Sequence, residues 1–192
     1  MLLIILGKDL NSIDKVKEGL RSEFEMKDLG ELQYFLGIQV QRNRSKRQLH
    51  INQSGYISSI LERFGMEDSK SALTSIATGT ALHKAIDGDT LVDLKSYQSL
   101  VGSQMYAMLC TRSDIAYAVS QVSQHSSAPT ETHQSIDKRG FRYLNATSTM
   151  RIIYDGSQGL KLKTYCDVDY AASMRRKSIM AFLFKLADAA VS

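Results

Sequence analysis

Residues 33–52 have the sequence QYFLGIQVQRNRSKRQLHIN, and this stretch predicts a β-hairpin. Apolar and polar residues alternate on both sides of a polar centre, a pattern typical of two paired strands. The sequence therefore predicts strands at Gln33–Val40 and Gln48–Asn52, joined by a tip at Arg42–Arg47. The basic residues of this tip are Arg42, Arg44, Lys46 and Arg47. Such a tip can lie along a phosphate backbone, although an ordinary charged turn has the same composition.

Helical spacing of apolar residues flanks this hairpin on both sides. One helix is predicted from Ile13 to Phe24 after caps at Asn11 or Ser12, and a shorter one between Ser54 and Gly65. Further helices and then strands are predicted at Tyr97–Leu109, Asp114–Ser123, Thr130–Leu144, Met150–Tyr154, Leu160–Tyr170 and Ser178–Leu186. The fold class predicted is α+β.

Two segments depart from these patterns. Leu2–Leu6 is apolar on both faces, as in a central strand of a covered sheet, so its place at the start of the chain predicts neighbouring strands that are missing or supplied by a partner. Residues 68–93 lose all periodicity and are rich in Ser, Thr, Gly and Asp. We expect a linker and a domain boundary there.

Composition and charge narrow the class of protein. The chain has 192 residues, 43% hydrophobic, and a net charge of +4, a mild basic bias that fits a polyanionic partner without requiring one. Cys110 and Cys166 lie far apart, which predicts structural thiols in a reducing compartment and no zinc site. Met1–Leu6 is too short for a signal-peptide core or a membrane span. The expected location is cytoplasmic or nuclear, with no membrane partner.

Two carboxylates in the predicted strand Leu160–Tyr170 are the candidate metal ligands. Alternation puts Asp167 and Asp169 on one face, where both side chains can meet one divalent ion. They would equally suit a solvated face beside neighbouring lysines. Metal-assisted cleavage needs several carboxylates, and only Asp188 follows, so a complete site is not predicted.

Other candidate groups are better explained by structural roles or by exposure to solvent than by a functional site. Further basic groups occur at Lys138, Arg139, Arg142, Lys161, Lys163 and Arg175–Lys177, but charge runs usually solvate a face. The four histidines have no carboxylate or cysteine companions at ligand spacing, so surface or hydrogen-bonded roles are predicted. The stripe of Met105, Tyr106 and Met108 fits core packing better than a binding role.

Longer motifs carry a resemblance to a known family. They are FEMKDLGEL at 24–32, YFLGI at 34–38, QSGYI at 53–57, LERFGM at 61–66, YQSLVGS at 97–103, TR at 111–112, DIAYAV at 114–119, RYL at 142–144, YDG at 154–156 and YCDVDYA at 165–171. In order and spacing the chain resembles the Pol polyprotein of copia-type retrotransposons, from the late palm of the reverse transcriptase into the start of RNase H. The parent activities are RNA-directed DNA polymerase and ribonuclease H.

The resemblance implies a division of the chain. Residues 1–67 would be a late palm and thumb-like segment, 68–95 a linker, 96–148 a helical connection and 149–192 the first strands of a truncated RNase H-like sheet. In the family, a Tyr-Val-Asp-Asp motif supplies polymerase metal ligands just before the segment that Met1–Leu6 matches. We therefore expect a chain truncated at both ends that lacks the polymerase ligands.

The resemblance also implies roles for single residues. Leu36 and Gly37 match the hairpin that positions the primer end, and Asp167 matches the first RNase H metal ligand. Mg²⁺ is the parent family's cofactor, and no other cofactor is implied. Asp137 and Gly140 stand in a helix that the family fills with better helix formers, which predicts a loss of stability.

Three functional hypotheses follow from these observations. The first is a catalytically inactive fragment that retains weak, non-specific binding to RNA–DNA or DNA duplexes. The second is a subunit that pairs with a complementary polymerase fragment, and the third is a protein-interaction module.

Overall fold

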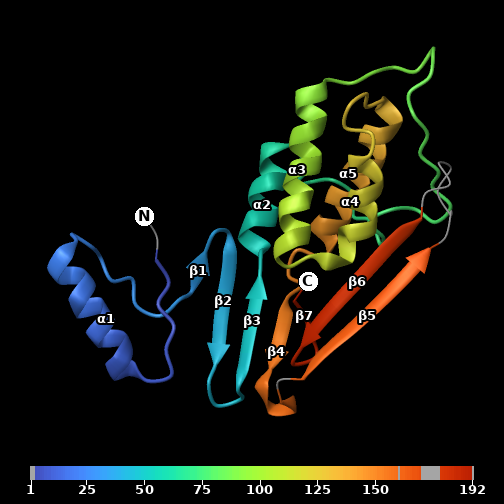
Figure 1. Cartoon of the computed structure of the whole chain (residues 1–192). Coiled ribbons are helices and arrows are strands. Elements are labelled where there is room, and N and C mark those ends of the chain that lie inside the picture. The colour runs from blue at the N-terminus through green and yellow to red at the C-terminus, as the bar shows by residue number, and fades with distance from the viewer. Residues whose placement is uncertain (1–2, 160, 170–177, 192) are drawn as a thin grey trace.

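Helices and strands mix along the chain in the computed structural model, which describes residues 3–159, 161–169 and 178–191 (Figure 1). In chain order the elements are α1 (Leu10–Glu23), β1 (Tyr34–Phe35), β2 (Ile38–Asn43), β3 (Gln48–Asn52), α2 (Ser54–Arg63), α3 (Leu94–Cys110), η1 (Ser113–Ile115), α4 (Ala116–Ser123), α5 (Glu131–Ala146), β4 (Ile152–Asp155), η2 (Gly156–Gln158), β5 (Leu162–Asp169), β6 (Ile179–Leu186) and β7 (Ala189–Ala190). The mixed composition of helix and sheet is confirmed. The predicted basic run Arg175–Lys177 lies outside the described residues.

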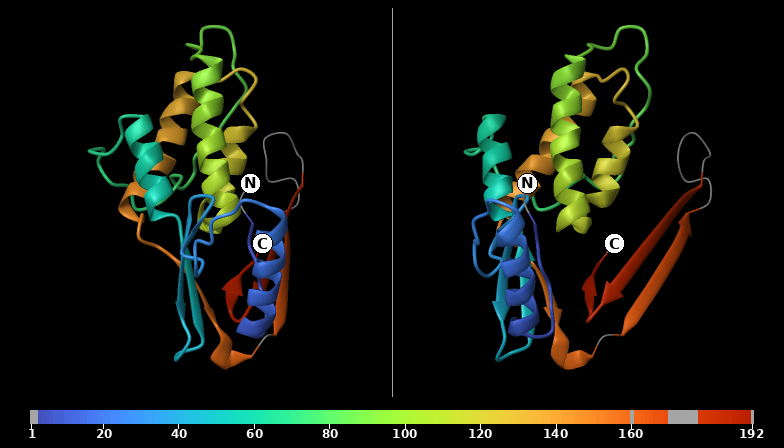
Figure 2. Two further views of the ribbon diagram at one scale, coloured as in Figure 1. Left: turned by 90° about the vertical axis from the view of Figure 1, so that its left-hand side faces the viewer. Right: turned by 60° about the vertical axis from the view of Figure 1, so that its left-hand side comes forward.

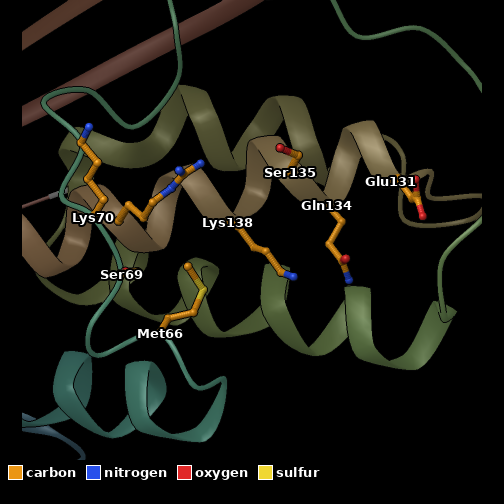
Figure 3. Close-up of a pocket in the computed structure, with 8 residues that line it drawn as sticks. Met66, Ser69, Lys70, Glu131, Gln134, Ser135 and Lys138 are labelled. Carbon is orange, nitrogen blue, oxygen red and sulfur yellow. The ribbon is translucent and has the colours of Figure 1, made fainter.

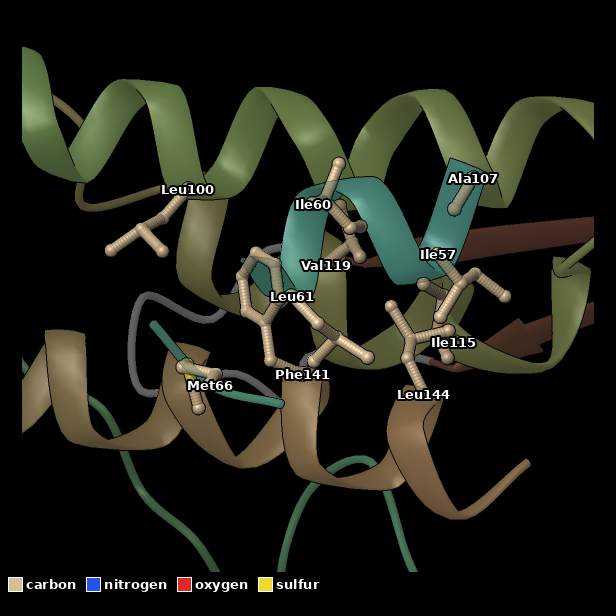
Figure 4. Packing of buried hydrophobic residues seen from close by; sticks show 10 residues of the cluster. All are labelled: Ile57, Ile60, Leu61, Met66, Leu100, Ala107, Ile115, Val119, Phe141 and Leu144. Carbon is tan, nitrogen blue, oxygen red and sulfur yellow. The ribbon is translucent and has the colours of Figure 1, made fainter. Parts of the chain in front are cut away.

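The hydrophobic core is built by α2, α3, α4 and α5 (Figure 4). Its buried side chains are Ile57, Ile60, Leu61, Met66, Leu100, Ala107, Ile115, Val119, Phe141 and Leu144. Phe64 packs edge-on against Phe141 with 5.3 Å between ring centroids. Burying an aliphatic or aromatic side chain stabilises a fold by roughly 1.5–3 kcal/mol, so these contacts hold the four helices together.

Residues 68–93 contain no helix or strand, and a single isolated bridge joins Leu91 to Thr130. The segment nevertheless packs on the helices: the Ala72 amide donates to the Arg142 carbonyl at 3.3 Å, and Val92 packs beside Tyr97. One core therefore extends to both sides of the expected linker. The division into four parts remains a prediction.

The predicted helices are confirmed, and their caps explain where they begin. Asp9 caps α1, in place of the predicted Asn11 or Ser12, because its side chain accepts from the Ser12 amide. Thr130 caps α5 as part of a capping box with His133. The His133 ring is buried, with Nδ1 accepting from the Thr130 amide at 3.0 Å and Nε2 donating to the His83 carbonyl at 2.9 Å. The predicted hydrogen-bonded role is confirmed for this histidine.

Two sheets complete the fold, and the first includes a strand from late in the chain. Its order is β1-β2-β3-β4, and the second sheet has the order β5-β6-β7. The predicted strand Met150–Tyr154 thus appears as β4, paired with β3 and not with β5. Figures 1 and 2 show α2, α3, α4 and α5 at one end of the molecule, the β2–β3 hairpin pointing away from them, and α1 apart from these four helices.

Two strand predictions are wrong in the described residues. Residues 3–6 form no strand, and the predicted strand Gln33–Val40 is broken into β1 and β2. Leu36 and Gly37 have positive φ angles of 47° and 75°, the geometry of a two-residue hairpin turn, so the chain reverses there. The continuous apolar run YFLGI at residues 34–38 gave no polar signal for this turn.

A buried polar cluster joins α3 to α5. Gln104 donates from Nε2 to the Asp137 carbonyl at 3.1 Å and to the Asp137 carboxylate at 2.5 Å. A Cβ at Gly140 would lie 2.1 Å from Oε1 of Gln104. The absence of a side chain at Gly140 therefore provides the space for Gln104, so this glycine has a packing role despite its poor helix propensity.

We expect Gly140→Ala to lower the free energy of unfolding by about 1–3 kcal/mol, because Gln104 must move and leave buried hydrogen-bonding groups unsatisfied. Urea denaturation measures this change. The matched control is Gly102→Ala in α3, where an added Cβ meets nothing within 4 Å. The control should be stabilised by up to about 1 kcal/mol through helix propensity. Equal effects at the two positions would contradict the packing role.

Burial raises the pKa of Asp137 to about 7, and one of its carboxylate oxygens has no hydrogen-bond partner among the described residues. The folded protein then keeps a proton that the unfolded chain releases near pH 4. This contribution to stability is complete below pH 4 and is lost as the pH rises towards 7. In that window the free energy of unfolding should fall by about 1.4 kcal/mol per pH unit from this group.

Asp137→Asn should remove this pH dependence while preserving the shape of the cluster. Urea denaturation from pH 4 to 8 tests this by comparing the two proteins, since other groups titrate in both. His133 is one of these, because burial lowers its pKa and gives the opposite slope. An unchanged difference between the two proteins across the range would contradict the assignment.

Candidate nucleic-acid interface

The tip of the β2–β3 hairpin is ordered by its own polar groups. The strands pair from Gln39–Asn52 to Asn43–Gln48, which leaves residues 44–47 as the turn. The Asn43 side chain accepts from the Lys46 amide at 3.0 Å, a contact that asparagine often makes in turns. The Gly156 amide donates to the Arg47 carbonyl at 2.9 Å, which ties the tip to the end of β4.

The basic side chains predicted at this tip are all exposed, and the structure brings them together on one hairpin: Arg42, Arg44, Lys46 and Arg47. Arg44 forms an ion pair with Glu31 at 3.0 Å, with both side chains more than half exposed. Exposed pairs are worth little, so this one is easily exchanged for a phosphate. Within the described residues the other three cations form no salt bridge.

The Leu36–Gly37 turn lies at the other end of β2 and is held by two tyrosines. The Tyr106 hydroxyl donates to the Leu36 carbonyl, and Gly37 lies against Tyr56. The two tyrosine rings meet edge-on with centroids 4.9 Å apart. Burial raises the pKa of both tyrosines, which keeps their hydroxyls protonated as donors.

Sequence reasoning missed this role of Tyr106, which was predicted as core. Met108 does pack on the core, whereas Met105 is exposed. The Leu36 side chain remains 64% exposed, so the turn presents an apolar side chain on a fixed backbone. β2 has six residues and a length of about 20 Å, so the exposed turn and the basic tip lie at opposite ends of one rigid hairpin.

Asp167 is exposed in the middle of β5, opposite Ala181 of β6. Asp188 is engaged with Lys163 at 2.6 Å, and the Asp169 side chain is not among those described. In the described part of the chain, no three His, Cys, Asp or Glu residues gather where they could hold a metal ion. The ligand role of Asp167 and the Mg²⁺ site that the resemblance implies remain predictions.

Comparisons with known proteins identify the family. The family described as reverse transcriptase (RNA-dependent DNA polymerase) matches residues 2–78. The Pol polyprotein from transposon TNT 1-94 of Nicotiana tabacum is 39% identical over 99% of this chain and 15% of its own length. The Pol polyprotein from transposon RE1 of Arabidopsis thaliana is 36% identical over 88% of the chain and 11% of its own length. No solved structure matches the chain.

A shorter relative is covered more completely. An uncharacterized mitochondrial protein of Arabidopsis thaliana is 32% identical over 94% of this chain and 73% of its own length. The chain belongs to the reverse transcriptase-related family of copia-type retrotransposon Pol polyproteins. It spans about 15% of the TNT 1-94 polyprotein. Among its described helices, none has the length and apolar character needed to cross a membrane.

Proposed function

We propose that this chain binds nucleic-acid duplexes, RNA–DNA or DNA, without sequence preference. The observation that carries the proposal is the β2–β3 hairpin, whose ordered tip gathers exposed cations. Phosphate contacts from Lys and Arg supply most of the affinity in non-specific binding. The Leu36–Gly37 turn, fixed by Tyr106, adds a contact for the sugar and base edges of the same duplex.

Within this proposal the chain acts as a late palm, thumb and connection segment followed by RNase H-like strands, in the cytoplasm or nucleus. It binds the template–primer and catalyses neither polymerisation nor cleavage. The polyprotein relatives are far longer than this chain, which spans 15% of one and 11% of the other.

Reversing the charge of Arg44, Lys46 and Arg47 together to Glu should weaken binding to a labelled RNA–DNA duplex at every salt concentration. Each phosphate contact contributes about 0.9 to the slope of log K against log salt for B-DNA. We expect the magnitude of the slope to fall by about 2–3. Fluorescence anisotropy at several salt concentrations provides the measurement.

The matched control reverses Lys15, Lys84 and Lys95 to Glu, which changes net charge equally at exposed positions scattered over α1, residues 68–93 and α3. The control should keep most of the slope. If both triple variants lose the same slope, the binding reflects net charge alone and the hairpin is not the site. A folded wild-type protein that does not bind the duplex sinks the proposal itself.

In the presence of Mg²⁺, the Asp167→Asn variant and the wild-type protein should leave the RNA strand of an RNA–DNA hybrid equally intact. The physical reason is that one carboxylate cannot hold two metal ions for phosphodiester cleavage. Gel analysis of a labelled hybrid reports cleavage, with duplex binding as the control for folding. Cleavage by the wild-type protein that disappears in the variant would show that the chain is an enzyme.

A second candidate, protein binding, is favoured by α1. None of its residues is buried, and its apolar side chains include Leu10 at 69% and Val16 at 49% exposure. Such a face suits a protein partner, for example a complementary polymerase fragment. This candidate takes precedence if the folded chain does not bind nucleic acid.

A further inference from the structure

A groove of about 490 Å³ lies between α5 and the start of the 68–93 segment, and no hairpin residue lines it (Figure 3). Gln134, Lys138 and Arg142 line it from successive turns of α5. Ser69 and Lys70 line it from the segment that runs past the helix. Figure 3 shows Gln134 and Lys138 extending from α5 to the same side.

Hydrogen bonds hold the groove in shape, and they do not involve the charged groups of Lys70, Lys138 and Arg142. The side-chain amide of Asn145 donates to the Glu67 carbonyl at 2.9 Å. The backbone amide of Ala72 donates to the Arg142 carbonyl at 3.3 Å. Arg139 donates to the Thr74 hydroxyl at 3.0 Å. These contacts fix residues 67–74 along α5, so both walls are preorganised.

The charge of the groove is positive and unneutralised. Lys70, Lys138 and Arg142 are the cations among its lining residues, and Glu131, at the N-terminal end of the helix, is the one carboxylate among them. Within the described residues, none of the three cations forms a salt bridge. Among the described residues, the buried Ser69 hydroxyl and the buried Nε of Arg142 also lack hydrogen-bond partners.

The chemistry of these groups selects phosphate. Arginine offers a planar fork of donors and lysine a mobile point charge, the two groups that proteins use for phosphate oxygens. From Gln134 to Arg142 the helix rises about 12 Å, and along the axis of a duplex each strand carries one phosphate about every 3.4 Å. The spacing therefore suits a chain of phosphates better than a single small anion.

We propose that this groove is a second phosphate-binding site, which engages the backbone of the nucleic acid that the hairpin binds. The proposal rests on the proposed function for the identity of the ligand and deepens it by adding a second contact surface. The groove and the hairpin would bind separate stretches of one nucleic acid, so their contributions to the salt dependence of binding should add.

The test replaces the two exposed lysines, Lys70→Gln with Lys138→Gln, which removes charge and preserves the side-chain stems. The control is Lys84→Gln with Lys95→Gln, which changes net charge equally at exposed positions outside the groove. Anisotropy with an RNA–DNA duplex gives the salt slope of each protein. Amide chemical shifts of Ser69 and Lys70 during titration with tripolyphosphate report the groove without any duplex.

We expect the groove variant to lose about 2 from the magnitude of the slope, the control to keep it, and tripolyphosphate to shift both amides only in proteins with an intact groove. If tripolyphosphate shifts the amides and the duplex slope is unchanged, the groove takes free phosphate only and the proposal is overturned. If neither readout changes in the variant, the proposal is also overturned, while duplex binding by the hairpin stands. If the wild-type protein does not bind the duplex at all, the proposed function is refuted together with this second site.

Discussion

The buried guanidinium of Arg112 is the contact on which the arrangement of helices and sheet depends. It is 1% exposed and makes a two-pronged ion pair with Asp114, at 2.9 Å and 2.8 Å. It also donates to the carbonyl and hydroxyl of Thr147, at 3.1 Å and 2.6 Å. Arg112 follows α3 and Thr147 follows α5, so one side chain ties the ends of two helices to the turn before α4. Removing Asp114 would leave the guanidinium buried without its charge partner, and a loss of this kind costs about 3–5 kcal/mol.

This contact also fixes where the chain leaves the helical core. Thr147 lies just before β4, and β4 joins the hairpin sheet through β3. Burial would raise the pKa of Asp114, but hydrogen bonds and the charge of Arg112 hold it below its ordinary value, so the pair remains ionised. The hairpin is thus anchored to the helices twice, by α2 directly after β3 and by β4. A basic tip on such a support is presented in one conformation, which reduces the entropy lost on binding.

Local patterns predicted the elements well and their partners poorly. The helical stripes and the cap Thr130 are properties of short stretches, and the structure contains those helices. The pairing of β4 with β3 joins residues about a hundred positions apart, and no local period encodes it. The turn at Leu36 was missed because it lies inside an apolar run, YFLGI at residues 34–38, that has the composition of a strand. Its stability comes from Tyr106, 70 residues away, whose contact no spacing rule could supply.

The same distinction applies to residues that looked unfavourable in isolation. Gly140 lowers helix propensity, yet Gln104 fills the space where its side chain would be. At the candidate site, the local sequence was enough to locate the basic residues, because charge at a hairpin tip is a local property. Their significance depends on what neutralises them, which only the fold shows: Lys163 is paired with Asp188, whereas the cations of the hairpin tip other than Arg44 form no ion pair in the described chain. Unneutralised charge on a preorganised backbone, and not the excess of basic residues, is therefore the feature that distinguishes a phosphate contact from an ordinary solvated surface.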